Sequence, residues 1–134
     1  MHLIRLFGIA VLAGALSGPA MAGPDSHTAS PVADLDSDSD KTIDISEMGK
    51  AASDTFDNID SDGDGKIDLH SSGNRLSKVE YKKADTDKDD LLDKNEYFAV
   101  ADSLLRAADK DKNGGLDEME FNSKEGKKLQ RLIQ

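Results

Sequence analysis

Four short stretches of this chain carry acidic or amide side chains at alternate positions. They begin at Asp36, Asp60, Asp85 and Asp109, so their starts lie 24, 25 and 24 residues apart. Side-chain oxygens recur at the first, third and fifth positions of each stretch, and an aliphatic residue stands at the eighth. Such spacing lets a tightly turning loop present several oxygens to one hard cation. The pattern therefore predicts a repeat of metal-binding loops.

Each stretch offers the kind and number of ligands that calcium prefers. Calcium takes six to eight oxygens at about 2.3–2.6 Å, and a position-7 carbonyl and a position-12 Glu would complete the set. The candidate ligands are Asp36, Asp38, Asp40, the Thr42 carbonyl and Glu47 in loop one (36–47); Asp60, Asp62, Asp64 and the Lys66 carbonyl in loop two (60–71); Asp85, Asp87, Asp89, the Leu91 carbonyl and Glu96 in loop three (85–96); and Asp109, Asp111, Asn113, the Gly115 carbonyl and Glu120 in loop four (109–120). Position 9 of loops one, three and four holds a further aspartate that could reach the ion directly or through water: Asp44, Asp93 and Asp117.

Residues 36–121 resemble the EF-hand family, and within it the small exported bacterial proteins that carry several closely spaced EF-hands. Loop four matches D-x-[DN]-x-[DN]-G-x5-E in full, from Asp109 through Gly114 to Glu120. A disordered acidic chain would produce one such match by accident, but not four in register. The resemblance implies an all-α fold, an array of helix-loop-helix units whose four calcium loops pair through short β-bridges. It also implies Ca²⁺ as the bound cofactor.

Position 6 of each loop should require a positive φ angle, for which the family uses glycine. Gly65 and Gly114 meet this need, and Asp90 tolerates the left-handed region better than most residues. Lys41 in loop one should cost about 1 kcal/mol there. On backbone grounds we expect loop four to bind most tightly.

Loop two is irregular because Ser71 stands where the other loops have Glu. Leu76 to Tyr81 repeats the closing pattern of the other loops, and Glu80 lies 20 residues after Asp60 instead of 11. Two interpretations follow. Either a nine-residue insertion, roughly 67–75, extends loop two so that Glu80 closes it, or 76–84 simply forms the helix that enters loop three. Helical periodicity does not separate them.

Amphipathic helices are expected after loops one and three. Apolar or small residues recur at the same helical offsets after each loop, at Met48, Ala51, Ala52, Thr55, Phe56 and Ile59, and at Tyr97, Val100, Ala101, Leu104, Leu105 and Ala108. A 12-residue helix is about 18 Å long, which places loops one and two at opposite ends. We therefore expect loop two to pair with loop three through Ile67 and Leu92, and loop one with loop four through Ile43 and Leu116. Residues 71–74 should turn the chain back.

The first 22 residues have the layout of a secretory signal peptide. Arg5 precedes an apolar run that ends at Leu16, and small residues surround an expected cleavage site after Ala22. A membrane anchor is the alternative, but the run is short for a span. We expect residues 23–34 to form a flexible leader, residues 35–134 to form the EF-hand domain, and the mature chain to be periplasmic or secreted. A small exported domain without cysteine favours stabilisation by metal.

The charge balance of the chain disfavours some classes of partner. With 27 acidic and 17 basic residues, the net charge of −10 disfavours nucleic acid and anionic membranes as partners. The three histidines form no recognisable triad, so we expect no enzymatic activity. The leading hypothesis is an exported calcium-binding protein that buffers calcium or folds with it. Extracellular calcium is plentiful enough to fill sites with dissociation constants of about 10⁻⁴–10⁻³ M. The alternative is a calcium-dependent module that docks an envelope or extracellular protein.

Overall fold

The computed structural model describes residues 30–134, a small helix-rich fold with two short antiparallel sheets. In chain order its elements are β1 (Ile43–Asp44), α1 (Ile45–Ile59), β2 (Lys66–Ile67), α2 (Lys78–Ala84), β3 (Leu92–Asp93), α3 (Lys94–Ala108), β4 (Gly115–Leu116), α4 (Glu118–Phe121) and α5 (Lys124–Ile133). The expected signal peptide and most of the leader lie outside the described residues. Between residues 30 and 134, no helix is long and apolar enough to cross a membrane.

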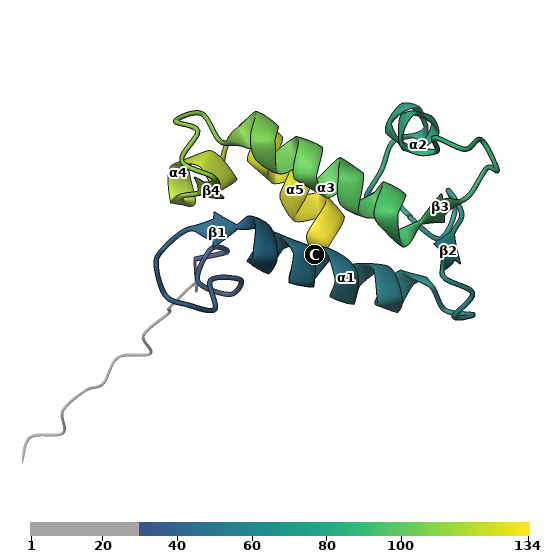
Figure 1. The fold of residues 1–134 in the computed structure, drawn as a ribbon, viewed down its shortest axis with the longest axis horizontal. Coiled ribbons are helices and arrows are strands. Elements are labelled where there is room, and N and C mark those ends of the chain that lie inside the picture. The colour runs from purple at the N-terminus through teal and green to yellow at the C-terminus, as the bar shows by residue number, and fades with distance from the viewer. Residues whose placement is uncertain (1–29) are drawn as a thin grey trace, which may run out of the picture.

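The two sheets join the loops in the expected pairs. β1 pairs with β4, with Ile43 opposite Leu116, and β2 pairs with β3, with Ile67 opposite Leu92. All four side chains are buried. The sheets lie at opposite ends of α1 and α3 (Figure 1), because a 15-residue helix of about 22 Å separates the loops at its two ends. The predicted pairing of loop one with loop four, and of loop two with loop three, is confirmed.

Helices α1 and α3 bury most of the stripes that the sequence predicts, whereas Ile59, Val100 and Leu104 are only partly buried. The buried residues are Met48, Ala51, Ala52, Thr55 and Phe56 in α1, and Tyr97, Ala101, Leu105 and Ala108 in α3. The Phe56 and Tyr97 rings meet edge to face, with centroids 5.5 Å apart. Such contacts between aromatic rings add to the free energy gained by burial. These two helices form the central layer to which the other elements attach.

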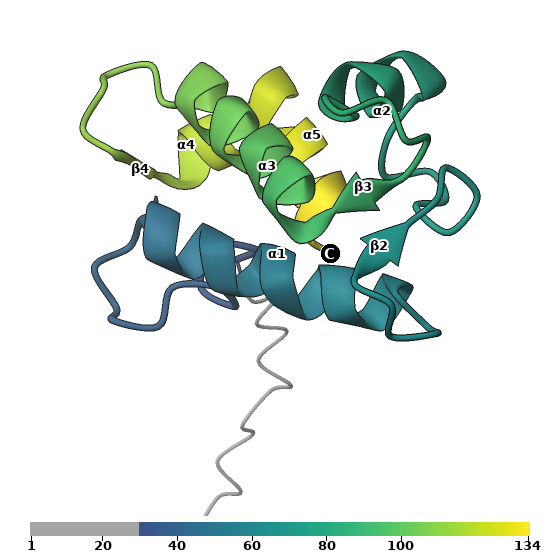
Figure 2. The same ribbon diagram turned by 45° about the vertical axis from the view of Figure 1, so that its right-hand side comes forward.

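The C-terminal segment is divided into two helices. α4 ends at Phe121, and Ser123 then caps α5 by accepting a hydrogen bond from the Gly126 N–H. A Cβ at position 126 would lie 2.3 Å from the Glu120 and Phe121 carbonyl oxygens. The absence of a side chain at Gly126 therefore permits the close approach of α4 to α5. α5 packs against both α1 and α3, and Figure 2 shows it behind α3.

Side chains from three separate segments hold the end of α5. Tyr97 donates its O–H to the Leu132 carbonyl at 2.5 Å, and Thr55 donates to the Ile133 carbonyl at 2.8 Å. The Arg75 guanidinium donates to the Gln134 carbonyl at 3.4 Å. The last carbonyls of a helix have no intrahelical donor, so these bonds satisfy groups that are otherwise unpaired. Residues 71–74 form a turn, as expected, and Arg75 directly after it helps to anchor α5.

The end of the expected leader is structured. Residues 31–35 form a turn in which the Leu35 and Asp36 N–H groups donate to the Val32 carbonyl, at 3.0 and 2.8 Å. The Val32 side chain is buried in the core. The ordered fold therefore begins a few residues earlier than the composition of residues 23–34 suggests.

Replacing Tyr97 by Phe should lower the free energy of unfolding by about 1–2 kcal/mol. The substitution keeps the ring but leaves the buried Leu132 carbonyl without its donor. Urea unfolding followed by circular dichroism measures the change. Val79→Ala is the control because Val79 is largely exposed; an equal loss in both variants would contradict the anchoring role of the Tyr97 hydroxyl.

Candidate metal centres

Acidic side chains that could hold a metal ion gather in all four loops. In each group, one oxygen from every residue lies within 4.8 Å of the others. The groups are Asp36, Asp38 and Asp40 in loop one; Asp60, Asp62 and Asp64 in loop two; Asp85, Asp87 and Glu96 in loop three; and Asp109, Asp111 and Glu120 in loop four. The structure therefore brings together carboxylates from four of the predicted ligand sets, two of them including the position-12 Glu.

The first aspartate of each loop is held by backbone N–H groups later in the same loop. Asp36 accepts hydrogen bonds from the backbone N–H groups of residues 40 and 41, and Asp60 accepts them from residues 63, 64 and 65. Asp85 accepts one from residue 90, and Asp109 accepts them from residues 113 and 114. Every loop thus curls around its first carboxylate. The donor at position 6 is shared by all four.

The third and fifth residues are held in the same way. The position-5 N–H donates to the position-3 side chain in each loop, and the position-7 N–H donates to the position-5 side chain. In loop one, Asp40 also accepts from the Thr42 hydroxyl at 2.7 Å, and these bonds lower the pKa of Asp40 below its ordinary value. The network holds the acidic side chains close together before any cation is considered.

Positive φ angles occur at positions 4 and 6 of every loop. Position 6 has φ of 71° at Lys41, 81° at Gly65, 63° at Asp90 and 93° at Gly114, which confirms the expected requirement. Position 4 behaves alike, with φ of 65° at Ser39, 70° at Gly63, 61° at Lys88 and 60° at Lys112. The sequence does not reveal the second requirement, because three of the four residues at position 4 carry a Cβ.

The position-12 glutamates each lie in the first turn of a helix as well as facing a loop. Asp44, Asp93 and Asp117, at position 9, are N-caps, and Glu47, Glu96 and Glu120 complete capping boxes by accepting the N-cap N–H. The other oxygen of each glutamate accepts the N–H at position 2, from Ser37, Thr86 and Lys110. The position-9 aspartates thus have a capping role that the metal-ligand interpretation does not include.

The hydroxyl residues at position 2 of loops one and three hold the glutamates, a role that the sequence pattern alone does not reveal. Thr86 donates both its N–H and its O–H to Glu96 at 2.8 Å, and Ser37 does the same to Glu47. Burial raises the pKa of Glu96, but the bonds from Thr86 and Asp93 outweigh it, so the net pKa shift is downward. A hydroxyl residue directly after the first Asp is the signal that would have identified them.

One oxygen in loop three has no protein partner. Asp85 is only 8% exposed; its Oδ2 accepts the Asp90 N–H at 3.1 Å, whereas its buried Oδ1 has no hydrogen bond. Leaving a buried carboxylate oxygen without a partner is costly. Glu96, which belongs to the same group, is 9% exposed. This is the most enclosed pair of carboxylates in the described loops, and it is suited to a cation.

Glu80 does not join the loop-two group. It occupies the N3 position of α2, where it accepts the Ser77 N–H at 2.9 Å and lies 3.5 Å from the Arg131 guanidinium. These Ser77 bonds, with the positive charges of Arg131 and Lys128, lower its pKa. α2 runs directly into Asp85, so 76–84 is the helix that enters loop three. Of the two interpretations left open by the sequence, the structure supports this one over closure of loop two by Glu80.

Loop two is consequently less complete than the others. The Ser71 N–H donates to Asp68 at 2.6 Å, at the point where each of the other loops begins a helix. The Ser61 N–H, at position 2, donates to the Ile59 carbonyl, whereas the position-2 N–H of the other loops donates to a glutamate. Tyr81 links this loop to loop three by donating to the Ile67 and Asp90 carbonyls at 2.8 and 3.0 Å. Loop two therefore lacks the glutamate bonds of the other loops and is joined to loop three through Tyr81.

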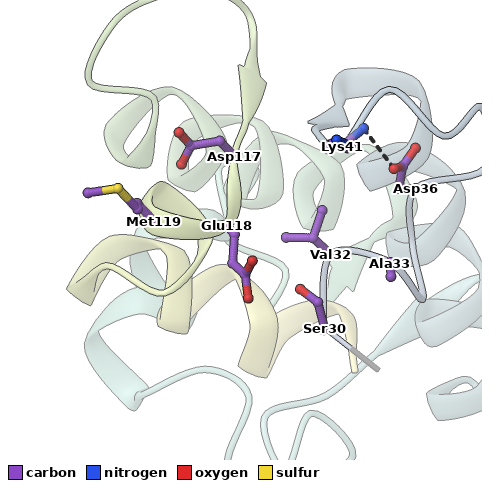
Figure 3. A pocket seen from close by; sticks show the side chains of 8 residues that line it. All are labelled: Ser30, Val32, Ala33, Asp36, Lys41, Asp117, Glu118 and Met119. Carbon is purple, nitrogen blue, oxygen red and sulfur yellow. Dashed lines mark hydrogen bonds between the residues drawn. The ribbon is translucent and has the colours of Figure 1, made fainter. Parts of the chain in front are cut away.

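Loops one and four meet closely beside the ordered start of the chain. The position-7 residues of all four loops lie at the paired strands: Lys66 and Gly115 are strand residues, and Thr42 and Leu91 directly precede strands. A Cβ at Gly115 would lie 2.9 Å from Thr42 Oγ1, so the contact requires glycine. A pocket beside this pair is lined by Ser30, Val32, Ala33, Asp36, Lys41, Asp117, Glu118 and Met119 (Figure 3). Asp36 faces the Lys41 amide there, as part of the loop-one network.

Comparison with known proteins adds no family assignment. No protein-family model matches the chain, and no curated protein is significantly similar to it. The functional interpretation therefore rests on the residues and geometry described above.

Glycine should suit position 41 better than alanine does. We expect Lys41→Gly to have a free energy of unfolding about 1 kcal/mol higher than Lys41→Ala, because only alanine keeps a Cβ at φ 71°. Chemical unfolding without divalent cations measures the difference. The same pair of changes at Lys50, inside α1, should give the opposite order, since glycine disfavours a helix interior. If the alanine variant is the more stable one at position 41 as well as at position 50, backbone strain at Lys41 is refuted.

Proposed function

We propose that this chain is an exported calcium-binding protein of the EF-hand type. The observation that carries the proposal is the unpartnered Oδ1 of Asp85, buried in a group with Asp87 and Glu96. A buried carboxylate oxygen that no N–H or hydroxyl reaches calls for a cation. The identity of the cation as calcium is supported by the donor chemistry and by the resemblance of the four loops to EF-hand sequences.

The donor set fits a hard cation of calcium's size. The available side-chain donors are carboxylates, together with the Asn113 amide, and no cysteine is present in the chain. Oxygen donors suit calcium and magnesium, whereas softer metals favour thiolate and imidazole. Loops with up to five acidic or amide side chains suit calcium, because magnesium demands stricter octahedral geometry. Asp85, Asp87, Asp89 and Glu96 would hold the ion in loop three, with corresponding residues in loops one and four.

The protein's own contribution is to preorganise these ligands. The backbone amides at positions 5, 6 and 7 fix the first three side chains, and the capping box together with the position-2 amide fixes the glutamate. A bound ion adds the positive charge that the clustered carboxylates lack. Each loop also contains a two-residue strand that pairs with the strand of its partner loop. Ordering one loop therefore supports the other.

Calcium binding of this kind favours buffering or calcium-dependent folding over fine sensing. The chain from residue 23 onward has only two methionines, Met48 and Met119, so it lacks a methionine-rich surface like those that sensor proteins expose on binding calcium. Met48 is buried in the core, and Met119 is an isolated exposed side chain. Export would place the protein where calcium is plentiful and moderate affinities suffice.

Glutamine substitutions at two capping glutamates test the proposal. Glu96→Gln should weaken calcium binding at loop three roughly tenfold or more, because it removes a charged ligand from the group. Glu80→Gln is the matched control: Glu80 occupies the same N3 position of a capping box but lies outside the loop groups. Isothermal titration calorimetry gives the affinity and the number of ions bound per chain. Equal effects of the two changes, or no binding to the unaltered protein at millimolar calcium, would refute the assignment.

Calcium should also stabilise the fold. A ligand that binds only the folded state adds about 2.7 kcal/mol when its concentration is one hundred times its dissociation constant. Thermal unfolding followed by circular dichroism should therefore show a midpoint that rises with calcium and falls again when a chelator is added. Potassium at equal ionic strength is the control for general charge screening, and an equal rise with potassium would argue against specific sites.

A further inference from the structure

A lysine of loop two reaches into loop three. Lys66, the first residue of β2, places its ammonium against Oδ2 of Asp89, the position-5 aspartate of loop three. The backbone brings the two together because Lys66 pairs with Asp93 across the β2–β3 bridge. Both side chains are about one-third exposed, at 38% and 33%. The ammonium thus places a positive charge beside the acidic candidate ligands of loop three.

This contact occupies the oxygen of Asp89 for which Asp40 and Asp64 have no hydrogen bond. Oδ1 of Asp89 accepts the Leu91 N–H, as the position-5 side chains do in the other loops, and Oδ2 accepts from Lys66. Asp40 and Asp64 also use Oδ1 for such bonds, and both belong to the carboxylate groups of their loops. Asp89 does not belong to the group formed by Asp85, Asp87 and Glu96. The lysine and the missing carboxylate therefore coincide at one residue.

The charges around Lys66 favour its ammonium form. The hydrogen bond to Asp89, reinforced by Asp87 and Asp93, raises the pKa of Lys66, and the same bond lowers the pKa of Asp89. The other pair of loops has no equivalent, because its position-7 residues are Thr42 and Gly115. An ion pair this exposed contributes little to folding stability. Its larger effect is on any second cation that approaches the same carboxylate.

We propose that Lys66 is a tethered cation that competes with calcium for Asp89 and so lowers the calcium affinity of loop three. This inference rests on the proposed calcium binding. Filling loop three requires the ammonium to leave Asp89, or to remain close to a divalent ion that repels it. Lys66 also belongs to loop two, where its N–H donates to Asp64. Loop two therefore sets the affinity of its partner loop through one side chain.

Removing the charge of Lys66 tests the proposal. Lys66→Met should raise the calcium affinity of loop three about three- to tenfold, the size expected for one nearby unit charge under partial screening. Lys66→Arg keeps the charge and should stay near the unaltered protein. Lys50→Met is the control for net charge, since Lys50 pairs with Asp54 on α1, outside the loops.

The readout can follow each loop separately in the full chain. The position-6 amides of Lys41, Gly65, Asp90 and Gly114 each donate to the first aspartate of their own loop, so their ¹⁵N NMR signals report the four loops. Calcium-buffered titrations then give the half-saturation of loop three from Asp90, with Lys41 and Gly114 as internal references. The proposal is supported if the Asp90 titration shifts to lower calcium in Lys66→Met while the Lys41 and Gly114 titrations do not, and an equal shift at all four amides would refute it.

The alternative outcomes separate the two proposals. If Asp90 responds to calcium with the same or weaker affinity in Lys66→Met, competition by Lys66 is refuted and calcium binding stands. The competition is equally refuted if Lys50→Met or Lys66→Arg produces the same gain. If none of the four amides responds to millimolar calcium in any variant, calcium binding itself fails and the role of Lys66 fails with it.

Discussion

Each of the four loops holds several carboxylates within a few ångströms of one another, and like charges at that distance repel. The rest of the structure depends on how the chain offsets this repulsion. Backbone N–H groups at positions 4 to 7 point at the first, third and fifth side chains, and the position-6 amide does so in every loop. Reaching this arrangement requires positive φ at two positions per loop. The acidic residues therefore dictate the backbone path between the helices.

The helices supply the second part of this stabilisation. In loops one, three and four the position-9 aspartate caps the next helix and the position-12 glutamate completes the capping box. Negative charge at a helix N-terminus is favoured by the exposed N–H groups and the helix dipole. The same glutamate reaches back to the amide at position 2. One side chain thus joins the start of a loop to the start of a helix, and ligand placement is coupled to helix formation.

This double role explains why Glu80 resembles a ligand in the sequence. A helix that starts with a capping box has Ser, Thr or Asp followed three residues later by Glu, and the closing half of loops one, three and four has the same pattern. Ser77 and Glu80 provide it for α2, nine residues beyond the regular position. The local pattern specifies a helix start, and only the tertiary position of that helix separates a ligand from a cap. The Arg131 guanidinium near Glu80 comes from α5, far away in the sequence.

The sequence by itself determined the elements that follow from short-range chemistry. The 24- or 25-residue repeat, the apolar stripes of α1 and α3 and the pairing of Ile67 with Leu92 and Ile43 with Leu116 all follow from local periodicity and helix length. Only the tertiary structure decided which groups from distant segments meet. It placed Val32 in the core, brought α4 and α5 together at Gly126 and directed Lys66 to Asp89. These contacts depend on side-chain directions across separate elements, which sequence periodicity does not encode because it describes only one element at a time.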